Sequence, residues 1–533
     1  MSTRPKASCT NRTSSGSGSN DENIFLTGKS CIFSPNFVKA LTTHRLHMQQ
    51  KTKWSQFGIL ITVFFFWGFV AASNDILIPV FKEKLHLEQW QAQMISFAFY
   101  VAYTVGSLIY YFISKFAGGD ILNRIGYKNG IALGLIISAL GALLFYPAAM
   151  SASFALLISG LFIIGLGYSL QQTAANPLAI IMGDPASGSQ RLSMAGGVNN
   201  FGTTIGPLLV SFAIFGSVTV GSSVAKEASI SSVKTPYLIL GALFLVIALI
   251  FKFSSLPNKI DTEEVSEDHA VAPDKLLHRS SPFKYPQLVL GMLGIFVYVG
   301  VEVTTASNLP EFMREKLATP TDQIAPFVSL YWASLMIGRW TNSTGAFGVS
   351  KSAQKILNFV MPYLAFGVFL AVNKIAGHDI TPFYIYAIII IAMIIGNILS
   401  KGNPARQLLI FSMMAIVALL VGIFASGMIS VFAFISVGLF CSTLWPCIFT
   451  LAIAGLGKHT NEGSSLLIMM IMGGGVISLL QGWLSNANLM GIQYSYFVPV
   501  AGFLYLAYYA VRAKAELKSQ GIDYDALQAA GGH

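Results

Sequence analysis

Residues 64–79 read FFFWGFVAASNDILIP and combine the composition of a membrane helix with a polar pair, Asn74 and Asp75. Only aromatic, aliphatic and small side chains precede the pair, and apolar residues continue beyond it from Ile76 to Phe81. A carboxylate at the centre of a membrane helix costs about 3 kcal/mol by insertion scales. Such a group normally faces the bundle interior or a water-filled cavity. We therefore predict that Asp75 works in a transport pathway; a solvated position at the outer interface is the alternative.

The composition of the chain excludes an ordinary soluble protein. Hydrophobic residues make up 54% of its 533 residues and charged residues only 11%, whereas charged residues are about 25% of a typical soluble domain. Apolar runs of about 20 residues recur, as expected of membrane-spanning helices. The net charge of +10 comes from basic residues crowded into alternate loops. Membrane topology explains that distribution, so we expect no nucleic-acid partner.

Neither the cysteines nor the known motifs indicate an enzyme. Cys9 and Cys31 lie in a polar tail and Cys441 and Cys447 in one apolar run, a spacing that forms neither a disulfide framework nor a metal site. The sequence has no Walker A loop, no GxGxxG after a strand, no HExxH and no Ser/His/Asp cluster on a plausible scaffold. We expect no enzymatic activity, no cofactor and no metal.

The hydropathy pattern predicts an all-α polytopic membrane protein with fourteen spans, six before a polar segment and eight after it. The predicted spans are 57–80, 91–114, 129–149, 153–181, 193–215, 236–253, 286–309, 325–347, 354–372, 382–399, 407–425, 430–456, 464–486 and 494–511. The predicted divisions are a tail at 1–53, a six-helix half at 54–253, a linker at 254–284, a second half at 285–512 and a tail at 513–533.

The distribution of basic residues predicts that both termini are cytoplasmic. The external loops would then carry only Lys82, Lys84, Lys226, Lys234, Arg314, Lys316 and Lys374 of the 33 basic residues. Short internal loops each carry basic residues, as the positive-inside rule requires. Removing one hairpin would keep this orientation, so a count of twelve spans stays open.

The first 50 residues are rich in Ser, Thr and Asn and show no sustained periodicity. That composition predicts a disordered tail over 1–53. The tail contains no signal-peptide core. Met48 stands just ahead of the first span and is an alternative start of translation.

Three ionisable residues lie deep in the predicted spans: Asp75, Glu302 and Arg339. Asp75 is in the first helix of the first half and Glu302 in the first helix of the second half. Matching acidic positions in two halves are typical of a transporter whose site lies between repeats, and a chance placement is the alternative. Both acids are candidates for proton coupling. Arg339 is expected near the cytoplasmic interface, where it can reach water or pair.

Amide side chains cluster in several of the predicted spans. Gln172 and Asn176 are four residues apart and share a helix face, while Pro177 loosens the backbone beside them. Gly202 and Gly206 form a Gly-x-x-x-Gly that lets helices approach closely. Amides suit a neutral polyhydroxylated ligand, and the alternative is that they join helices by hydrogen bonds. The predicted binding residues are Asn74, Gln172, Asn176, Asn199, Asn200, Glu302, Asn308 and Gln481.

The internal loop between the second and third spans reads GGDILNRIGYKNG over 118–130 and contains Asp120, Arg124 and Lys128. Alone it would fit a plain solvated loop. Its order of residues resembles the loop motif of the major facilitator superfamily. That resemblance implies a gating role, locking the two halves of the protein in one state.

Further motifs resemble one family, the fucose–galactose–glucose:proton symporters. They are Trp67-Gly68, residues 74–79, residues 172–177, YVGVEV at 298–303, YWASLMIGRW at 331–340, residues 444–446 and GSSLLIMMIMGGG at 463–475. The resemblance covers nearly all of 57–512. It implies a major facilitator fold with alternating access about a central sugar site, and it matches Asp75 to the family's proton-coupling carboxylate.

The chain departs from the fucose permease branch at three positions. That branch has glutamate where this chain has Gln172, glutamine where it has Glu302, and a glutamine where it has Gly196. The differences favour another hexose and the glucose/galactose-like branch. The family norm is twelve spans, so a hairpin at about 354–399 is an insertion, which we expect to be peripheral.

The resemblance implies proton-coupled hexose import across the bacterial inner membrane by a protein that we expect to be monomeric. Sodium stays open as the coupling ion, and so does a fucose or amino-sugar substrate. A drug or metabolite exporter of the same fold would need a more apolar cavity. A sugar sensor would need a signalling domain, which neither tail provides.

Overall fold

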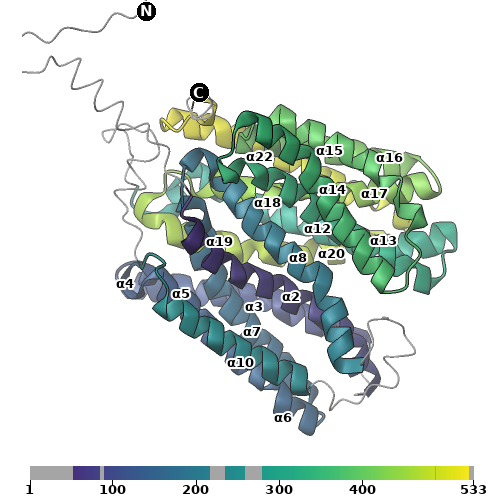
Figure 1. The fold of residues 1–533 in the computed structure, drawn as a ribbon, viewed down its shortest axis with the longest axis horizontal. Coiled ribbons are helices and arrows are strands. Elements are labelled where there is room, and N and C mark those ends of the chain that lie inside the picture. Colours follow the sequence, from purple (N-terminus) through teal and green to yellow (C-terminus); the bar gives the residue numbers. More distant parts are fainter. Residues whose placement is uncertain (1–51, 85–88, 216–233, 259–278, 487, 527–533) are drawn as a thin grey trace, which may run out of the picture. The chain divides into compact units, whose positions relative to one another are not determined.

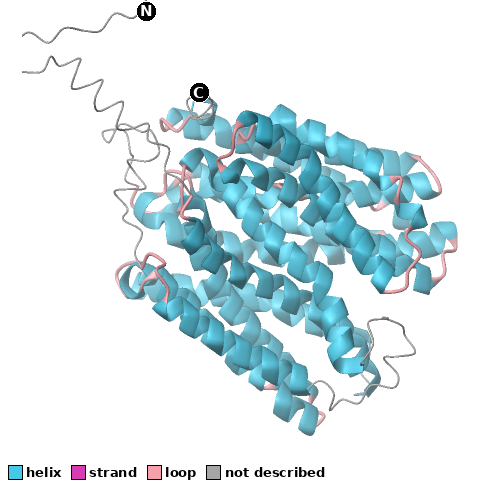
Figure 2. Cartoon of the chain, in the orientation of Figure 1, coloured by secondary structure: helices cyan, strands magenta, loops and turns pink. Residues whose placement is uncertain are grey.

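The computed structural model describes residues 52–84, 89–215, 234–258, 279–486 and 488–526, and describes side chains only outside 72–97, parts of 207–215, 321–322 and 351. The described residues form helices joined by short loops, without a strand among them (Figure 2). The all-helical fold class is therefore confirmed. The tail predicted at 1–53 lies outside the described residues up to residue 51, including Met48, and so do residues 259–278 of the predicted linker.

Helices before the linker pack as one half, which we call the N-half (Figure 1). They are α2 (Trp54–Lys84), α3 (Gln89–Phe116), α4 (Ile121–Ile125), α5 (Tyr127–Leu143), α6 (Phe145–Met150), α7 (Phe154–Ile181), α8 (Gly188–Phe215) and α10 (Lys234–Phe253). Within it α2 packs on α8, α5 on α7 and α10, and α3 on α7.

Helices after the linker form the C-half. They are α12 (Pro286–Leu317), α13 (Thr321–Ser343), α14 (Lys351–Ile375), α15 (Tyr386–Ser400), α16 (Pro404–Phe424), α17 (Met428–Cys441), α18 (Leu444–Ile453), α19 (Thr460–Met469), α20 (Gly473–Leu484), α21 (Gly491–Tyr494) and α22 (Phe497–Ser519). The two halves meet where α8 contacts α13 and where α19 contacts α3 and α7.

Eleven helical segments of the described residues are long and apolar enough to cross a membrane. Each predicted span coincides with a helix or a pair of helices, but three are interrupted. The segment 430–456 divides into α17 and α18, 464–486 into α19 and α20, and 129–149 into α5 and α6. Pro446 and Pro147 lie just beyond two of these breaks, and a proline cannot supply the N–H that continues a helix.

A short 3₁₀ segment, η8 (Met470–Met472), separates α19 from α20. Three glycines follow it, Gly473 to Gly475. Gly473 lies so close to α12 that a Cβ atom there would be 2.0 Å from the Phe296 carbonyl oxygen. The break therefore lets the second part of this span approach α12 directly.

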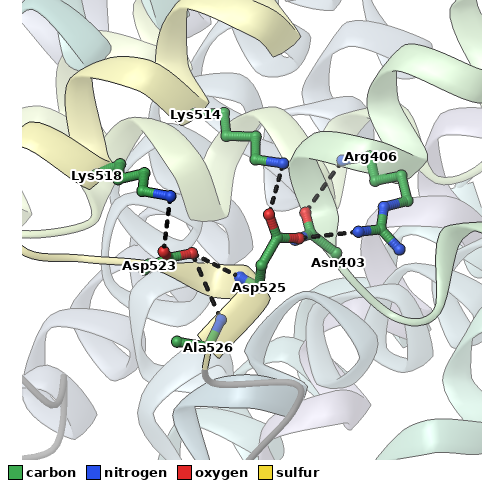
Figure 3. A network of polar contacts seen from close by, with 7 residues as sticks. All are labelled: Asn403, Arg406, Lys514, Lys518, Asp523, Asp525 and Ala526. Carbon is green, nitrogen blue, oxygen red and sulfur yellow. Dashed lines mark hydrogen bonds and ion pairs between the residues drawn. The ribbon is translucent and has the colours of Figure 1, made fainter.

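The C-terminal residues fold back onto the end of the bundle that carries Lys128, Lys252, Arg406 and Lys518, which we call the basic end. α22 continues past residue 512 to Ser519 before the chain turns. Asp525 then accepts hydrogen bonds from Asn403 Nδ2 (2.8 Å) and Arg406 Nη2 (3.0 Å) and pairs with Lys514 Nζ at 2.6 Å (Figure 3). The hydrogen bond from Lys514 lowers the pKa of Asp525. These contacts hold the end of the described chain on α16 and α22.

The closest helix packing in the N-half is between α2 and α8. A Cβ atom on Gly68 would lie 1.9 Å from the Asn199 carbonyl oxygen. On the facing helix, a Cβ on Gly202 would lie 2.4 Å from the Phe65 carbonyl oxygen. The close approach predicted from the Gly-x-x-x-Gly motif is therefore present, and it fixes the position of the helix that carries Asn74 and Asp75.

We expect Gly68→Ala to destabilise the protein while Gly58→Ala on the same helix does not. The new methyl group at position 68 has no room, and overpacking of this kind costs about 1–3 kcal/mol. Gly58 has no atom within 4 Å of its would-be Cβ, so alanine there only improves helix propensity. The measurement is the thermal unfolding midpoint in detergent. Equal midpoints for the two variants would contradict the packing described here.

Candidate functional site

The acid in the C-half, Glu302, is buried near the middle of α12 with 9% of its surface exposed. Its carboxylate has two polar neighbours, the Tyr298 hydroxyl one turn earlier and the positive charge of Arg339 on α13. Its backbone carbonyl accepts a hydrogen bond from the Tyr331 hydroxyl at 2.8 Å. Glu302 therefore lies in a polar cluster inside an otherwise apolar half, where an isolated charge would be costly.

Arg339 is half-buried near the C-terminal end of α13 and contacts both halves, so its expected pairing is observed, while its position relative to the membrane surface stays a prediction. Its Nε donates to the Ser442 carbonyl (3.0 Å) and its Nη2 to the Tyr298 hydroxyl (3.5 Å), both in the C-half. Its Nη1 donates to Asn200 Oδ1 at 2.7 Å in the N-half. Pro446 explains the free acceptor on Ser442, because a proline removes the N–H that would bond the carbonyl four residues earlier.

Two polar residues of α7, Gln172 and Asn176, differ in their hydrogen bonding. Gln172 is half-buried and its Nε2 donates to the Tyr103 hydroxyl on α3 at 2.9 Å. Asn176 is 1% exposed, and its Nδ2 has no hydrogen-bond partner. Buried amides are nearly always satisfied, so an unpaired one invites a water or ligand. Asn176 is therefore an amide of this set with a buried donor that has no partner among the described residues.

The neighbouring glutamine, Gln171, was not singled out from the sequence. It accepts a hydrogen bond from Trp67 Nε1 at 2.9 Å and donates to Ser138 Oγ at 3.0 Å. This chain of contacts joins α2, α7 and α5. Sequence alone does not separate Gln171 from Gln172, because adjacent helix residues differ only in the direction they face.

Other predicted amides are already hydrogen-bonded between or within helices. Asn199 Nδ2 donates to the Phe64 carbonyl (3.0 Å), and Asn308 Nδ2 donates to the Thr304 carbonyl one turn earlier (2.8 Å). Gln481 is fully buried, accepts from Thr304 Oγ1 at 2.7 Å and donates to Ser495 Oγ at 3.1 Å. These bonds fit the alternative reading, in which such amides hold helices together.

Asn74 and Asp75 belong to α2, whose backbone is described through Lys84. Their side chains lie outside the described residues. α2 packs along α8, the helix whose Asn200 contacts Arg339. The role predicted for Asp75 therefore stays a prediction.

The predicted gating loop lies at the basic end. Asp120 caps α4 by accepting from the Leu122 N–H at 2.8 Å, and the Tyr110 hydroxyl donates to it. Burial raises the pKa of Asp120 above its ordinary range. Arg124 donates to the Ala117 carbonyl and Lys128 Nζ to the Ser254 carbonyl at 3.3 Å. Arg124 and Lys128 thus make contacts inside the N-half, whereas Asp120 also hydrogen-bonds Asn461 of the C-half.

Residues next to these three reach the C-half. The Tyr127 hydroxyl donates to Asn461 Oδ1, and Asn461 Nδ2 donates to Asn123 Oδ1 at 3.3 Å. Asn461 is buried at the start of α19. The loop therefore touches the other half through the predicted residue Asp120 and also through Asn123 and Tyr127, which the sequence did not identify because only charged positions were considered.

Hydroxyl groups make further bonds between the halves to backbone carbonyls, and three of them involve α19. Ser464 Oγ donates to Thr173 O (2.9 Å), Ser465 Oγ to Ser107 O (3.0 Å) and Thr104 Oγ1 to Met469 O (3.3 Å). Pro177 deprives the Thr173 carbonyl of its helical donor. The halves are thus joined along α19, α3 and α7.

These features define a class of protein: two helical halves that meet about buried polar groups inside a membrane. Residues 59–479 match the Major Facilitator Superfamily, and the chain belongs to that superfamily. Within it, the chain belongs with the glucose/galactose transporters and fucose–proton symporters. It is 32% identical to a glucose/galactose transporter of Brucella abortus, covering 88% of this chain and 97% of the relative. It is 28% identical to the L-fucose–proton symporter of Escherichia coli, covering 81% and 87%.

Solved structures agree with this assignment. A crystal structure of the Escherichia coli fucose:proton symporter in the outward conformation superposes with a TM-score of 0.63 at 26% identity, covering 86% of this chain and 98% of that one. A proton:xylose symporter structure shares the fold, with a TM-score of 0.52 at 12% identity. The predicted major facilitator fold is confirmed.

We expect Gln481→Leu to lower stability more than Asn176→Leu. Leucine at 481 removes the buried acceptor of the Thr304 hydroxyl and a donor to Ser495 Oγ, at about 1–3 kcal/mol. Leucine at 176 removes an amide whose Nδ2 is unpaired, so the midpoint should change little or rise. Thermal unfolding of the two purified variants in detergent measures the difference. A larger loss for Asn176→Leu would show that its amide is engaged and would remove it as a free ligand donor.

Proposed function

We propose that this chain imports a hexose of the glucose or galactose type across a bacterial inner membrane, in symport with protons. The observation that carries the proposal is the match over 97% of the length of a relative named as a glucose/galactose transporter. Glu302 and unpaired Asn176 supply buried acceptors and donors for sugar hydroxyls. Carboxylates bind hydroxyl groups well in sites that exclude water.

The proposed topology has fourteen spans and both termini in the cytoplasm. α3, α8 and α13 would cross the membrane together with the eleven segments that meet the hydropathy criterion. The basic end would then face the cytoplasm, as the positive-inside rule expects. Helices α14 and α15 would be the additional hairpin, and we propose that the transporter works as a monomer.

In the proposed cycle, Asp75 takes up a proton while the central site is open to the outside. Neutralising this carboxylate removes a charge from the membrane interior and favours sugar binding and closure. Asn74, Gln172, Asn176, Glu302 and Asn308 are the proposed sugar ligands. Asn199, Asn200 and Gln481 stay as predictions, because their hydrogen bonds between helices or halves, like that of Gln172 to Tyr103, would have to be exchanged for bonds to the sugar.

Release to the cytoplasm requires the basic end to open. Opening would break the bonds of Asn461 to Asn123 and Tyr127, and those of Ser464 and Ser465 to the N-half. Each of these bonds joins polar groups that become accessible to water once the halves separate. Their individual cost is therefore small, about 0.5–1.5 kcal/mol each, which suits a transition that has to be reversible.

The test is counterflow in proteoliposomes loaded with one unlabelled sugar at a time, with the matching labelled sugar outside. We expect exchange of galactose or glucose, because counterflow needs only alternating access and no driving ion. In the same vesicles Asp75→Asn should keep exchange but lose accumulation under a pH gradient, since a permanently neutral side chain carries no proton.

Glu311→Gln is the matched control, because Glu311 is an exposed acid on α12 that pairs with Arg314. It should accumulate sugar as the unmodified protein does. Accumulation driven by sodium and indifferent to pH would replace the proton as the coupling ion. Exchange of fucose or an amino sugar alone would redirect the substrate assignment, and exchange of no tested sugar by folded protein would refute the sugar assignment.

A further inference from the structure

Two residues of α13, Arg339 and Trp340, hold the C-half against the N-half through the backbone of α8. Arg339 Nη1 donates to the Gly196 carbonyl at 3.3 Å as well as to Asn200 Oδ1 at 2.7 Å. Trp340 Nε1 donates to the Gly197 carbonyl at 3.1 Å. We call these contacts the α8–α13 clasp. They place a guanidinium and an indole directly on a helix backbone.

Glycine at both positions of α8 makes this contact sterically feasible. A Cβ atom on Gly196 would lie 3.1 Å from Arg339 Nη1, and one on Gly197 would lie 2.6 Å from Trp340 Cδ1. Because position 196 has no side chain, the Gly196 carbonyl is open to the arginine.

The same guanidinium is connected to the acid of the central site. Arg339 Nη2 donates to the Tyr298 hydroxyl at 3.5 Å, and Tyr298 is the hydrogen-bonding neighbour of the Glu302 carboxylate. Arg339 and Glu302 also interact directly by charge. Arg339 therefore contacts Asn200 of the N-half through Nη1 and, through Nη2, the tyrosine that hydrogen-bonds the Glu302 carboxylate. Trp340, the other member of the clasp, makes neither a hydrogen bond nor a ring contact with Glu302 or Tyr298 among the described residues.

A guanidinium that is half-buried between the two halves is stabilised by an opposite charge nearby. Glu302 supplies that charge from within the same half. If Glu302 becomes neutral, or its oxygens bind a ligand, Arg339 loses part of this electrostatic stabilisation. Movement of its guanidinium toward water at the basic end then becomes favourable. That movement withdraws Nη1 from Asn200 and Gly196 and loosens the clasp.

We propose that Arg339 is a positioning residue that transmits the state of Glu302 to the contact between the two halves. With Glu302 charged and unoccupied, Arg339 holds α8 and keeps the basic end closed. When Glu302 is neutralised or engaged, the clasp weakens and the basic end opens. The inference rests on the proposed function only in requiring that the halves alternate, so its test uses no sugar.

The experiment measures the distance between spin labels on Lys252→Cys and Lys355→Cys, in a background with Cys9 and Cys31 replaced by serine. Both lysines are exposed at the basic end, one in each half, while Cys441 and Cys447 are buried away from the label. In lipid nanodiscs we expect Arg339→Gln to raise the ratio of long to short distances about tenfold, the effect of losing one charged hydrogen bond. Glu302→Gln should shift the distribution in the same direction.

The decisive result is non-additivity, because residues that act through one another do not give independent effects. Glu302→Gln should cause no further opening in Arg339→Gln, yet should add fully to Trp340→Phe, which loses only the clasp bond to Gly197. Arg339→Lys, which keeps the charge but loses the fork of donors, replaces Arg339→Gln if that variant does not fold. Arg512→Gln removes an exposed arginine that pairs with Glu516 within α22 and should leave the distances unchanged.

Two outcomes would overturn the proposal. One is that Arg339→Gln opens the basic end while Glu302→Gln leaves the distances as they are in the unmodified protein. Arg339 would then stabilise the contact between the halves independently of Glu302. If neither variant changes the distances, the clasp does not control the closure. Failure of the counterflow experiment would not affect the test of this proposal, because the distances are measured without substrate.

Discussion

A backbone carbonyl inside a membrane must find a hydrogen-bond donor, and the contact between the halves depends on this constraint. Pro177 has no N–H, so the Thr173 carbonyl in α7 has no helical partner. Ser464 of the C-half supplies one at 2.9 Å. The same logic applies within the C-half, where Pro446 frees the Ser442 carbonyl and Arg339 Nε binds it at 3.0 Å. Irregular helices thus create the acceptors by which the two halves and their charged residues are positioned.

This arrangement explains how a transporter can be closed at either end of the bundle with similar free energies. Bonds from serine, threonine and asparagine to carbonyls or amides are individually modest, and water can replace them once the interface opens. Glycines on α8, α12 and α20 add close helix contacts that need no large side chains. The charged groups of the central site then determine which end is closed. Their solvation free energy changes more than that of any neutral group when the site passes from a water-excluded to a hydrated state.

Much of the fold could be predicted from the sequence because membrane helices are long, apolar and bounded by polar loops. Each predicted span has a helix at its position, and Glu302 is buried as its apolar surroundings required. The interruptions at 442–443 and 470–472 were not predicted, since apolar residues continue across them and only the proline and glycine nearby hint at a break. Hydropathy measures transfer into the membrane and does not measure helix continuity.

The contacts of individual polar side chains were harder to predict. Arg339 lies near the end of α13, which predicted that it could pair but not which partners it would have. Helical side chains point back toward the N-terminus of their helix, so the guanidinium extends into the bundle toward Tyr298. Likewise, nothing in the sequence distinguishes a satisfied amide such as Gln481 from an unpaired one such as Asn176. That difference depends on partners that the fold brings from more than ten residues away.

The most direct test of the central constraint is a double-mutant cycle of Pro177→Ala and Ser464→Ala, read as the distance between the labels at positions 252 and 355. Alanine at 177 restores an N–H that can bond the Thr173 carbonyl within α7. We predict that Ser464→Ala opens the basic end in the unmodified background and has no effect once Pro177 is replaced. An equal effect of Ser464→Ala in both backgrounds would contradict the account, because the bond between the halves would then not depend on the carbonyl that Pro177 frees.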